Sequence, residues 1–359
     1  MTEQVELDGP PRKVLILRLG ALGDVVFLLP CLSLLRRAWP EAELHWMVKA
    51  PYVDLLAENP ALTKVWPFRK GARGLIEAAA SLRDEGFDLV LDYHANLRSG
   101  VLSKATGCRQ RVGFARPHNK EMNSLFNRTR VALPEHVVHK VERNLYLTRC
   151  LPGVAEDGRP ELFFAADRQA EARVEGCLAE GAGPLLLVHP GSSSKGAIKR
   201  WFLERYAEVL EVALGAGARV MLLWGDRGER DRALEVAERV GRRDLVVDER
   251  LSLRELIALF RRASLYLGVD SGPLHLANAV GLDVLGLYGP KAPEIYRPYH
   301  GAPGVLARND EVGCPPCNAT RCHNPEGRVC LEALSARDVA SEVLLRLGLE
   351  RLSVSHEGR

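Results

Sequence analysis

Three short segments of the sequence combine glycines with charged or hydroxyl side chains, and each segment follows an apolar run typical of a buried strand. The first segment, 18–24, reads R-L-G-A-L-G-D and has two glycines three residues apart. This spacing differs from the G-x-G-x-x-G dinucleotide fingerprint. It allows a tight turn that places Asp24 at the start of a helix. There the carboxylate either serves as an N-cap or lies in the cleft where a ligand binds.

The second segment lies at 189–201 and reads H-P-G-S-S-S-K before K-R-W. It supplies backbone N–H groups, the hydroxyls of Ser192, Ser193 and Ser194, and the ammonium groups of Lys195 and Lys199. These are the donors that a diphosphate requires. The alternative is a flexible loop whose lysines are exposed to solvent.

The third segment, 268–275, reads G-V-D-S-G-P-L-H and leads from a strand into a helix. Gly272 lets the backbone approach a ligand closely, and Pro273 suits the first position of a helix. The N–H groups of the helix N-terminus would then face an anion, with Asp270 and His275 on either side. The alternative for His275 is a structural role on the helix.

Strand-like and helix-like segments alternate along the chain in two blocks, with a break near 151–183. The apolar runs at 13–19, 184–189 and 265–269 are typical of parallel strands covered on both faces. Further strands are expected at 43–48, 87–92, 218–224, 245–247 and 284–287, and helices at 25–38, 201–214, 228–240, 252–262 and 273–280. This pattern predicts an α/β protein with two doubly wound domains. Because ligands bind at the carboxyl ends of such strands, we expect a substrate in a cleft between two facing domains.

Length and composition agree with a two-domain soluble protein. The chain has 359 residues, of which 47% are hydrophobic and 26% charged. No apolar run approaches the roughly 20 residues that span a bilayer. The first ten residues lack the basic and apolar regions of a secretion signal, so we expect a cytoplasmic location.

Basic residues are concentrated between Arg98 and Arg149. This segment of 52 residues holds eleven Lys or Arg and three Glu, a net charge of +8, while the whole chain carries +3. No nucleic-acid-binding motif accompanies the charge, so we expect no nucleic-acid partner. A phosphorylated or carboxylated partner or an anionic membrane surface would suit it. The alternative is an ordinary solvated face.

Four of the eight cysteines lie close together in the sequence, at Cys314, Cys317, Cys322 and Cys330. A C-x-x-C pair followed by two more cysteines resembles a structural zinc site with four thiolate ligands. Unligated thiols and disulfides are the alternatives. The other four, Cys31, Cys108, Cys150 and Cys177, are isolated, and we expect them to be buried.

Together, these segments resemble the lipopolysaccharide heptosyltransferases, glycosyltransferase family 9, which have the GT-B fold of two Rossmann-like domains. The resemblance extends from about Lys13 to Leu349. Its motifs are K-V-L-I-L-R-L-G-A-L-G-D-V, V-H-P-G-S-S-S with K-R-W, L-L-W-G-D-R-G-E-R, and L-G-V-D-S-G-P-L-H-L-A with L-Y-G-P. Each is weak alone, and their order and spacing make the resemblance specific.

The resemblance implies a role for each matching position. Asp24 matches the general base that takes the proton of the acceptor hydroxyl, and we expect closure of the cleft to raise its pKa by desolvation. Arg18 matches a basic position beside the acceptor, and Lys120 and Arg143 are weaker candidates for acceptor contacts. Candidate donor-binding residues are Ser192, Ser193, Lys199, Glu229, Asp270, Ser271, Gly272, Pro273 and His275. Among them, Lys199 matches the lysine that holds the diphosphate, and Glu229 the glutamate that binds the ribose.

The implied activity is inverting transfer of heptose from ADP-heptose to the inner core of lipopolysaccharide, with no cofactor required. The acceptor would be an anionic glycolipid, reached by peripheral contact with the cytoplasmic face of the inner membrane. Residues 1–165 would form the acceptor-binding domain and 166–335 the donor-binding domain, with a C-terminal helix in 336–359 packing back toward the former. The alternatives are a family-9 transferase with another nucleotide sugar or acceptor, and a two-domain protein that binds a nucleotide sugar without turnover.

Overall fold

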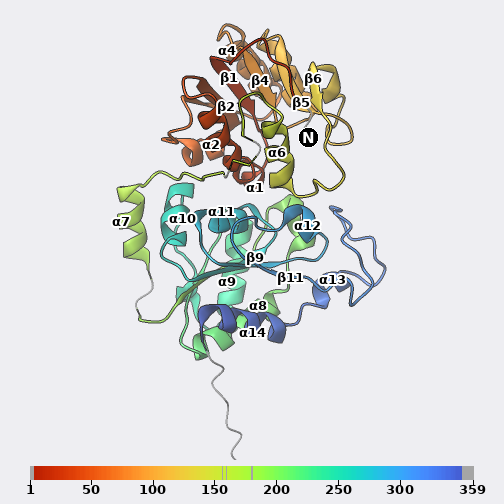
Figure 1. Cartoon of the computed structure of the whole chain (residues 1–359). Coiled ribbons are helices and arrows are strands. Elements are labelled where there is room, and N and C mark those ends of the chain that lie inside the picture. The colour runs from red at the N-terminus through yellow and green to blue at the C-terminus, as the bar shows by residue number, and fades with distance from the viewer. Residues whose placement is uncertain (1–3, 156, 159, 179–180, 350–359) are drawn as a thin grey trace, which may run out of the picture. The chain divides into compact units, whose positions relative to one another are not determined.

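The protein consists of two compact α/β units, and the chain passes from one to the other after Ala165. The computed structural model describes residues 4–155, 157–158, 160–178 and 181–349 (Figure 1). Every strand in the two main sheets pairs in parallel with its neighbours. The predicted fold class, α/β with two doubly wound sheets, is confirmed. Within the described part of the chain, no helix is long and apolar enough to cross a membrane.

The first unit is built on a six-stranded sheet with the order β3-β2-β1-β4-β5-β6. The chain places β2 and β3 on one side of β1 and then β4, β5 and β6 on the other. The direction of winding therefore reverses between β1 and β4, which is where open α/β sheets bind ligands. The strands are β1 Lys13–Leu17, β2 Glu43–Lys49, β3 Lys64–Phe68, β4 Leu89–Asp92, β5 Gln110–Phe114 and β6 Thr129–Val131.

The helices of the first unit pack in two pairs, α2 with α6 and α4 with α5. The single helix predicted at 25–38 is two helices in the structure, because Phe27 and Leu28 separate α1 from α2 and Pro30 lies in the first turn of α2. The helices are α1 Leu22–Val26, α2 Leu29–Ala38, α3 Val53–Leu56, α4 Ala72–Arg83, α5 Leu97–Ala105 and α6 Lys140–Arg149.

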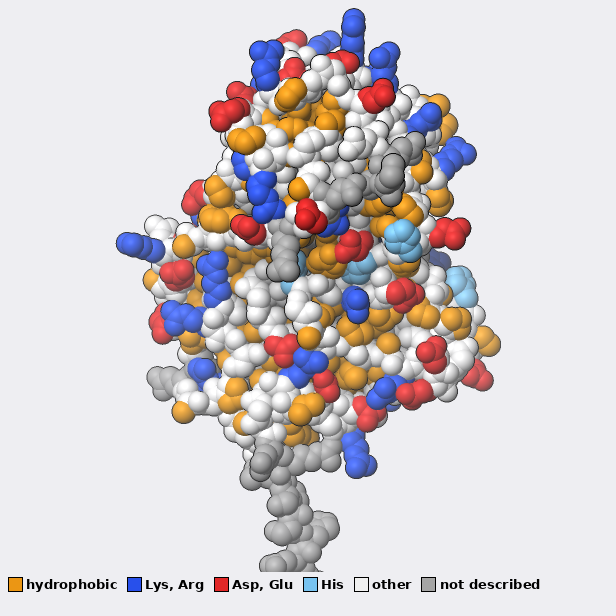
Figure 2. All heavy atoms as spheres, viewed as in Figure 1, with side chains coloured by type: hydrophobic (Ala, Val, Ile, Leu, Met, Phe, Trp, Pro, Cys, Tyr) orange, Lys and Arg blue, Asp and Glu red, His pale blue; other side chains and the backbone are white. Residues whose placement is uncertain are grey.

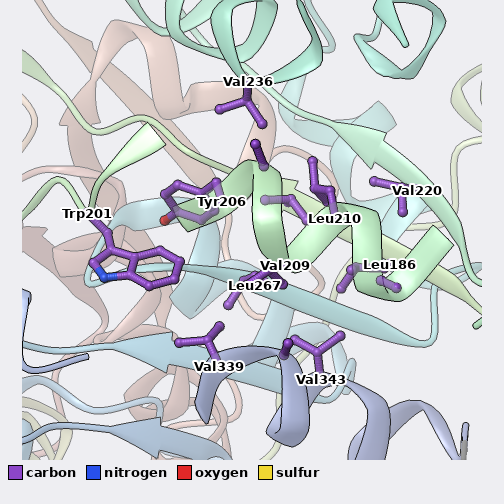
Figure 3. Close-up of a cluster of buried hydrophobic side chains, with 14 of the residues drawn as sticks. Leu186, Trp201, Tyr206, Val209, Leu210, Val220, Val236, Leu267, Val339 and Val343 are labelled. Carbon is purple, nitrogen blue, oxygen red and sulfur yellow. The ribbon is translucent and has the colours of Figure 1, made fainter. Parts of the chain in front are cut away.

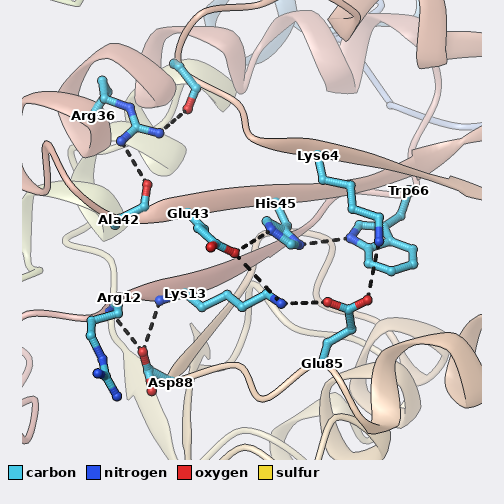
Figure 4. A network of polar contacts seen from close by, with 11 residues as sticks. Arg12, Lys13, Arg36, Ala42, Glu43, His45, Lys64, Trp66, Glu85 and Asp88 are labelled. Atoms are coloured by element: carbon cyan, nitrogen blue, oxygen red, sulfur yellow. Dashed lines mark hydrogen bonds and ion pairs between the residues drawn. The ribbon is translucent and has the colours of Figure 1, made fainter.

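A polar network fixes the amino ends of the first strands (Figure 4). The Asp88 carboxylate accepts hydrogen bonds from the backbone N–H groups of Arg12 and Lys13, at 2.9 and 3.0 Å. The Lys13 ammonium group lies 2.6 Å from Glu85, and the indole of Trp66 donates to His45 at 3.2 Å. The network lies at the edge of the sheet opposite to the carboxyl ends, so we assign it a structural role.

The second unit contains a five-stranded sheet with the order β11-β10-β9-β7-β8. Its winding reverses between β7 and β9. The strands are β7 Leu185–His189, β8 Arg219–Leu222, β9 Leu265–Val269, β10 Val284–Leu287 and β11 Gly304–Leu306. The strand predicted at 245–247 is wrong, since only a single bridge joins Val246 to Leu222 there.

Helices lie on both faces of the second sheet (Figure 1). One group consists of α8, α9 and α14, and the other of α7, α10 and α11. The helices are α7 Arg168–Cys177, α8 Leu203–Gly215, α9 Arg227–Val240, α10 Leu253–Phe260, α11 Gly272–Val280, α12 Pro293–Tyr296, α13 Val329–Glu332 and α14 Ala336–Leu347.

The core of the second unit explains the position of α14. Trp201 and Tyr206 pack edge to face, with ring centres 4.9 Å apart, beside Leu186 and Leu267 (Figure 3). Val339 and Val343 of α14 belong to the same cluster. The apolar face of α14 packs against α8 and β9 within the second unit. Packing of this helix toward the N-terminal domain stays a prediction. Residues 350–359 of that prediction lie outside the described residues.

Candidate functional site

In the first unit, the Arg18 side chain links the carboxyl ends of the two strands that flank the reversal of winding. Arg18 directly follows β1, and its Nη2 lies 2.6 Å from Oδ1 of Asp24. Its Nη1 donates a hydrogen bond to the carbonyl oxygen of Tyr93, directly after β4. Arg18 is buried, while the Asp24 side chain keeps 36% of its exposure. The sheet thus presents one fixed, accessible carboxylate at the position where ligands bind.

Asp24 is not the N-cap of α1, because Ala21 occupies that position. The role of Asp24 as a base stays a prediction. Asp24 occupies the third helical position, and its Oδ2 accepts the backbone N–H of Ala21 at 3.0 Å. The carboxylate therefore satisfies one free N–H group of the helix N-terminus and remains partly open to solvent.

The electrostatic surroundings keep Asp24 ionised. Burial raises the pKa of Asp24, but the charges of Arg18 and Lys140 and the hydrogen bond from Ala21 lower it by more, so the pKa lies below its usual value. Burial acts on this pKa in the expected direction, and the rise expected on closure of the cleft stays a prediction. A carboxylate with a lowered pKa is ready to accept a proton at neutral pH, although its basicity is weak.

Two residues of this site were missed in the sequence, Lys140 and His94. Burial and the charge of Arg18 lower the pKa of Lys140 to about 8, against an opposing effect of Asp24. Burial and Arg18 likewise lower the pKa of His94 to about 4. The only sequence signal was the position of His94 directly after a strand and of Lys140 at a helix start.

The weaker acceptor candidates Lys120 and Arg143 lie within electrostatic reach of the same place. Both are among the charges that lower the pKa of Lys140. Arg18 and Lys140 act directly on the Asp24 carboxylate, and Lys120 and Arg143 act on Lys140. Positive charge of this kind favours an anionic ligand.

The second unit places its charged residues at its own reversal of winding, after β7 and β9. Nζ of Lys199 lies 2.9 Å from Oδ2 of Asp270 and also donates to the Asp270 carbonyl oxygen. Nε2 of His275 lies 3.0 Å from Oδ1 of Asp270. Burial raises the pKa of Asp270, but the hydrogen bond with His275 and the charge of Lys199 lower it to about 2. The Asp270 carboxylate is therefore ionised and fixes the position of both neighbours.

The N-terminus of α11 lies in the same segment. Ser271 is its N-cap, Gly272 its first residue and Pro273 its second. The nine-residue helix directs free N–H groups and the positive end of its dipole toward the loop that carries Asp270. Helix α11 therefore begins at Gly272, one residue before its predicted start at Pro273.

Glu229 lies close to Gly191 of the second segment, 189–201. Its Oε2 accepts the backbone N–H of Gly225 at 2.8 Å and lies 3.2 Å from Nε2 of His189. Burial raises the pKa of Glu229, and the His189 contact together with backbone hydrogen bonds lowers it below its usual value. A Cβ atom at Gly191 would come within 2.7 Å of Cγ of Glu229, so this close approach requires glycine.

The two serine candidates differ in their surroundings. The buried Ser192 hydroxyl donates to the carbonyl oxygen of Gly196 at 2.9 Å, and Arg200 donates to the Ser192 carbonyl oxygen at 2.6 Å. Ser193 is exposed. Ser192 therefore stabilises its own loop, while Ser193 is accessible to a ligand.

The cysteine-rich loop does not present a metal-ligand set. Cys317 and Cys322 are exposed and Cys330 is buried. Burial and the neighbouring Cys314 raise the pKa of the Cys330 thiol to about 11. In the part of the chain that the structure describes, no group of three or more His, Cys, Asp or Glu side chains is placed to hold a metal ion. Zinc at these cysteines stays a prediction, which metal analysis of the purified protein would test.

The four isolated cysteines are not all buried as predicted. Cys31, Cys108 and Cys150 are buried, but Cys177, the last residue of α7, is exposed.

A family model and a curated relative both indicate the same protein family. A family model described as glycosyltransferase family 9 (heptosyltransferase) matches residues 76–326. The chain is 29% identical over 327 residues to lipopolysaccharide heptosyltransferase 1 of Pseudomonas aeruginosa, covering 86% of this chain and 87% of that protein.

Solved structures share the fold. A family 9 glycosyltransferase from Veillonella parvula has a TM-score of 0.80 at 22% identity, covering 96% of this chain and 99% of that one. The E. coli heptosyltransferase WaaC, solved with ADP-2-deoxy-2-fluoro heptose, has a TM-score of 0.67 at 22% identity, covering 92% and 98%.

Proposed function

The chain belongs to glycosyltransferase family 9, and from this membership we propose that it transfers heptose from ADP-heptose to the inner core of lipopolysaccharide. The observation that carries the proposal is the position of the charged side chains. Asp24 lies at the ligand-binding edge of the first sheet, and Lys199 and Asp270 lie at that of the second. The heptosyl donor and acceptor classes come from the relatives named above.

In the proposed reaction, the first unit supplies the base. The acceptor hydroxyl gives its proton to Asp24 as its oxygen attacks the anomeric carbon of the donor. Arg18 holds one carboxylate oxygen and the backbone of Ala21 holds the other, so the base keeps a fixed orientation. The surrounding cations Lys120, Lys140 and Arg143 bind the anionic acceptor.

The second unit binds the nucleotide diphosphate and stabilises its departure. An ammonium group has three N–H donors, and Lys199 uses two of them on Asp270, which leaves one for the β-phosphate. The N-terminus of α11 adds backbone donors for the negative charge that develops as the bond to the sugar breaks. Glu229 accepts a hydrogen bond from a ribose hydroxyl.

The proposed mechanism inverts the anomeric carbon in one displacement and uses no metal ion. We expect the anomeric configuration of the product to be opposite to that of the donor, as read by NMR coupling constants. We also expect EDTA to leave the rate unchanged, because Lys199 and α11 meet the phosphate charge. Retention of configuration, or a rate restored only by magnesium or manganese, would contradict the mechanism.

Gly20 tests whether the position of Asp24 matters. A Cβ atom at Gly20 would lie 2.2 Å from Oδ2 of Asp24, so Gly20→Ala must displace the carboxylate. We expect turnover to fall about 10- to 100-fold, since small misplacements of a catalytic group have effects of this order. Gly176→Ala is the matched control, because no atom lies within 4 Å of its added Cβ. Equal turnover in the two variants, with both folded, would remove the positional requirement.

We further propose that the first unit contacts the cytoplasmic face of the inner membrane. The loop between β5 and β6 follows the carboxyl end of β5 and exposes two apolar side chains, Met122 at 60% and Leu125 at 76%. Four exposed basic residues lie in or beside this loop: Arg116, Lys120, Arg128 and Arg130. Apolar side chains among cations are typical of peripheral contact with an anionic lipid surface. Elsewhere, Figure 2 shows basic and acidic side chains interspersed on the face in view.

Flotation with vesicles tests this contact. We expect binding to anionic vesicles that weakens at high salt, and little binding to neutral vesicles, because each basic residue contributes up to about 1 kcal/mol. Changing the four basic residues of the loop to Gln should abolish binding. The control variant removes the same charge from exposed positions in and before α4, by changing Arg69, Lys70, Arg73 and Arg83 to Gln. Equal loss of vesicle binding in both variants would show that the loop is an ordinary solvated surface.

A further inference from the structure

Three arginines converge on one cavity of the second unit, outside the candidate donor residues. The cavity has a volume of about 430 Å³, and its lining includes Arg200, Arg232, Arg328 and Phe202. None of the residues assigned above to donor binding lines it. The volume lies within the range of small-molecule sites.

Backbone carbonyl groups hold the three guanidinium groups in place. Arg328 donates to the carbonyl oxygen of Arg200 at 2.6 Å, and Arg232 donates to those of Pro190 and Trp201 at 3.2 and 3.3 Å. Arg200 donates to the carbonyl oxygen of Ser192. Each guanidinium has five N–H donors, so these contacts leave several donors on every arginine.

These contacts leave the positive charge of the cluster uncompensated. Carbonyl groups accept hydrogen bonds but carry no net charge, and none of the three arginines forms an ion pair with a carboxylate of the described residues. Glu204, the only acidic side chain of the lining, is exposed. Burial and the charges of Arg200 and Arg328 lower the pKa of Arg232, despite an opposing effect of Glu235. A bound anion would relieve this repulsion.

The site is built rather than formed by free surface side chains. Each of the three arginines is half-buried. The Arg328 guanidinium lies 4.9 Å from the ring centre of Phe202, which fixes its plane. Fixed guanidinium groups lose little freedom on binding and match the oxygens of a phosphate in pairs.

We propose that Arg200, Arg232 and Arg328 form a second anion site, which binds a phosphate group apart from the donor diphosphate site. The ligand is either free phosphate or a phosphate monoester, whether soluble or on a lipid. This inference does not depend on the transferase activity, because it rests on the cavity and its charges alone.

The test is calorimetric titration of the full chain with inorganic phosphate and with glycerol 3-phosphate, at constant ionic strength and with saturating ADP. ADP occupies the donor site, and the part of the remaining phosphate binding that depends on Arg328 reports the arginine site. We expect Arg328→Gln to weaken this binding at least about tenfold, as expected for loss of a charged hydrogen bond. Lys199→Ala should leave it unchanged.

Arg205→Gln is the matched control. Arg205 also lies over Phe202, at 5.0 Å, and donates to the carbonyl oxygens of Leu331, Glu332 and Leu334, but it does not line the cavity. It holds more carbonyl groups than Arg328 does, so a general loss of structure would appear in this variant first. The phosphate affinity of Arg205→Gln should equal that of the unchanged protein. Arg328→Lys, which keeps the charge, should recover part of the loss.

Vesicles distinguish the sources of the phosphate. The protein that carries the four Gln substitutions in the β5–β6 loop is tested for binding to phosphatidylcholine vesicles that contain or lack phosphatidic acid. The same measurement is made after Arg328→Gln is added to that protein. Binding of phosphatidic acid that needs Arg328 assigns a lipid phosphate, and binding of soluble phosphate alone assigns a free one. Three results would overturn the proposal. They are absence of binding to both phosphatidic acid and soluble phosphate, loss of phosphate binding when ADP is added, and equal phosphate affinity in the Arg205 and Arg328 variants.

Discussion

Replacing Asp24 by Asn should lower turnover about 100-fold or more while the affinity for ADP stays within a few-fold. Asparagine keeps the size of the side chain and can still accept the Ala21 N–H, but it cannot take a proton. The donor residues lie in the other unit, so their affinity for nucleotide should not depend on Asp24. Steady-state rates and ADP titration of both proteins measure the two effects.

The pH dependence adds a control for this prediction. The pKa of Asp24 is lowered, so the carboxylate stays ionised as the pH falls below neutrality and loses its charge only below the usual range of an aspartate. The activity between pH 5 and 7 should therefore show no loss due to protonation of Asp24. Near-normal turnover of Asp24→Asn would return Asp24 to a purely structural role at the start of α1.

Lys199→Ala should weaken the binding of ADP by about 1.5–3 kcal/mol, the contribution of a hydrogen bond to a charged group. The substitution removes one ammonium charge and leaves the Asp270 carboxylate without its ion-pair partner. The binding of adenosine, which has no phosphate, should hardly change. Titration calorimetry with both ligands gives the comparison.

Two further variants separate the causes of that loss. Lys199→Ala combined with Asp270→Asn also removes the negative charge of Asp270, so any recovery of affinity measures the repulsion between this carboxylate and the phosphates. Glu229→Ala should weaken ADP binding less than Lys199→Ala does, and the effect should vanish for a nucleotide without ribose hydroxyls. Equal ADP affinity in the unchanged protein and Lys199→Ala would exclude Lys199 from the diphosphate site.

The fold could be predicted where burial leaves a continuous apolar run. The runs at 13–19, 184–189 and 265–269 are β1, β7 and β9, the central strands on which both sites are built. Strands β3, β5, β6 and β11 were missed. β3 contains a proline, and β6 and β11 have only three residues each, so pairing with a neighbour rather than local pattern defines them.

The sequence could predict site residues only where one short segment of the chain positions them. The motif glycines of the first segment indicated correctly that Asp24 lies at the start of a helix, because the turn that they form is local. Contacts between distant segments gave no signal, which is why Lys140 was missed. The 2.6 Å ion pair between Arg18 and Asp24 could not be read from their spacing of six residues either, because it depends on the side-chain conformations. The exposed apolar residues Met122 and Leu125 likewise became visible only in the structure.

The most direct test of the account is the release of ADP from ADP-heptose with and without a lipopolysaccharide inner-core acceptor. A transferase breaks the bond to the sugar only when the acceptor hydroxyl is present to attack it. We expect ADP to appear in proportion to the acceptor that is converted, and only a trace without acceptor or with Asp24→Asn. A protein that binds ADP-heptose but releases no ADP when acceptor is added would be a binding protein without turnover, and this result would contradict the account.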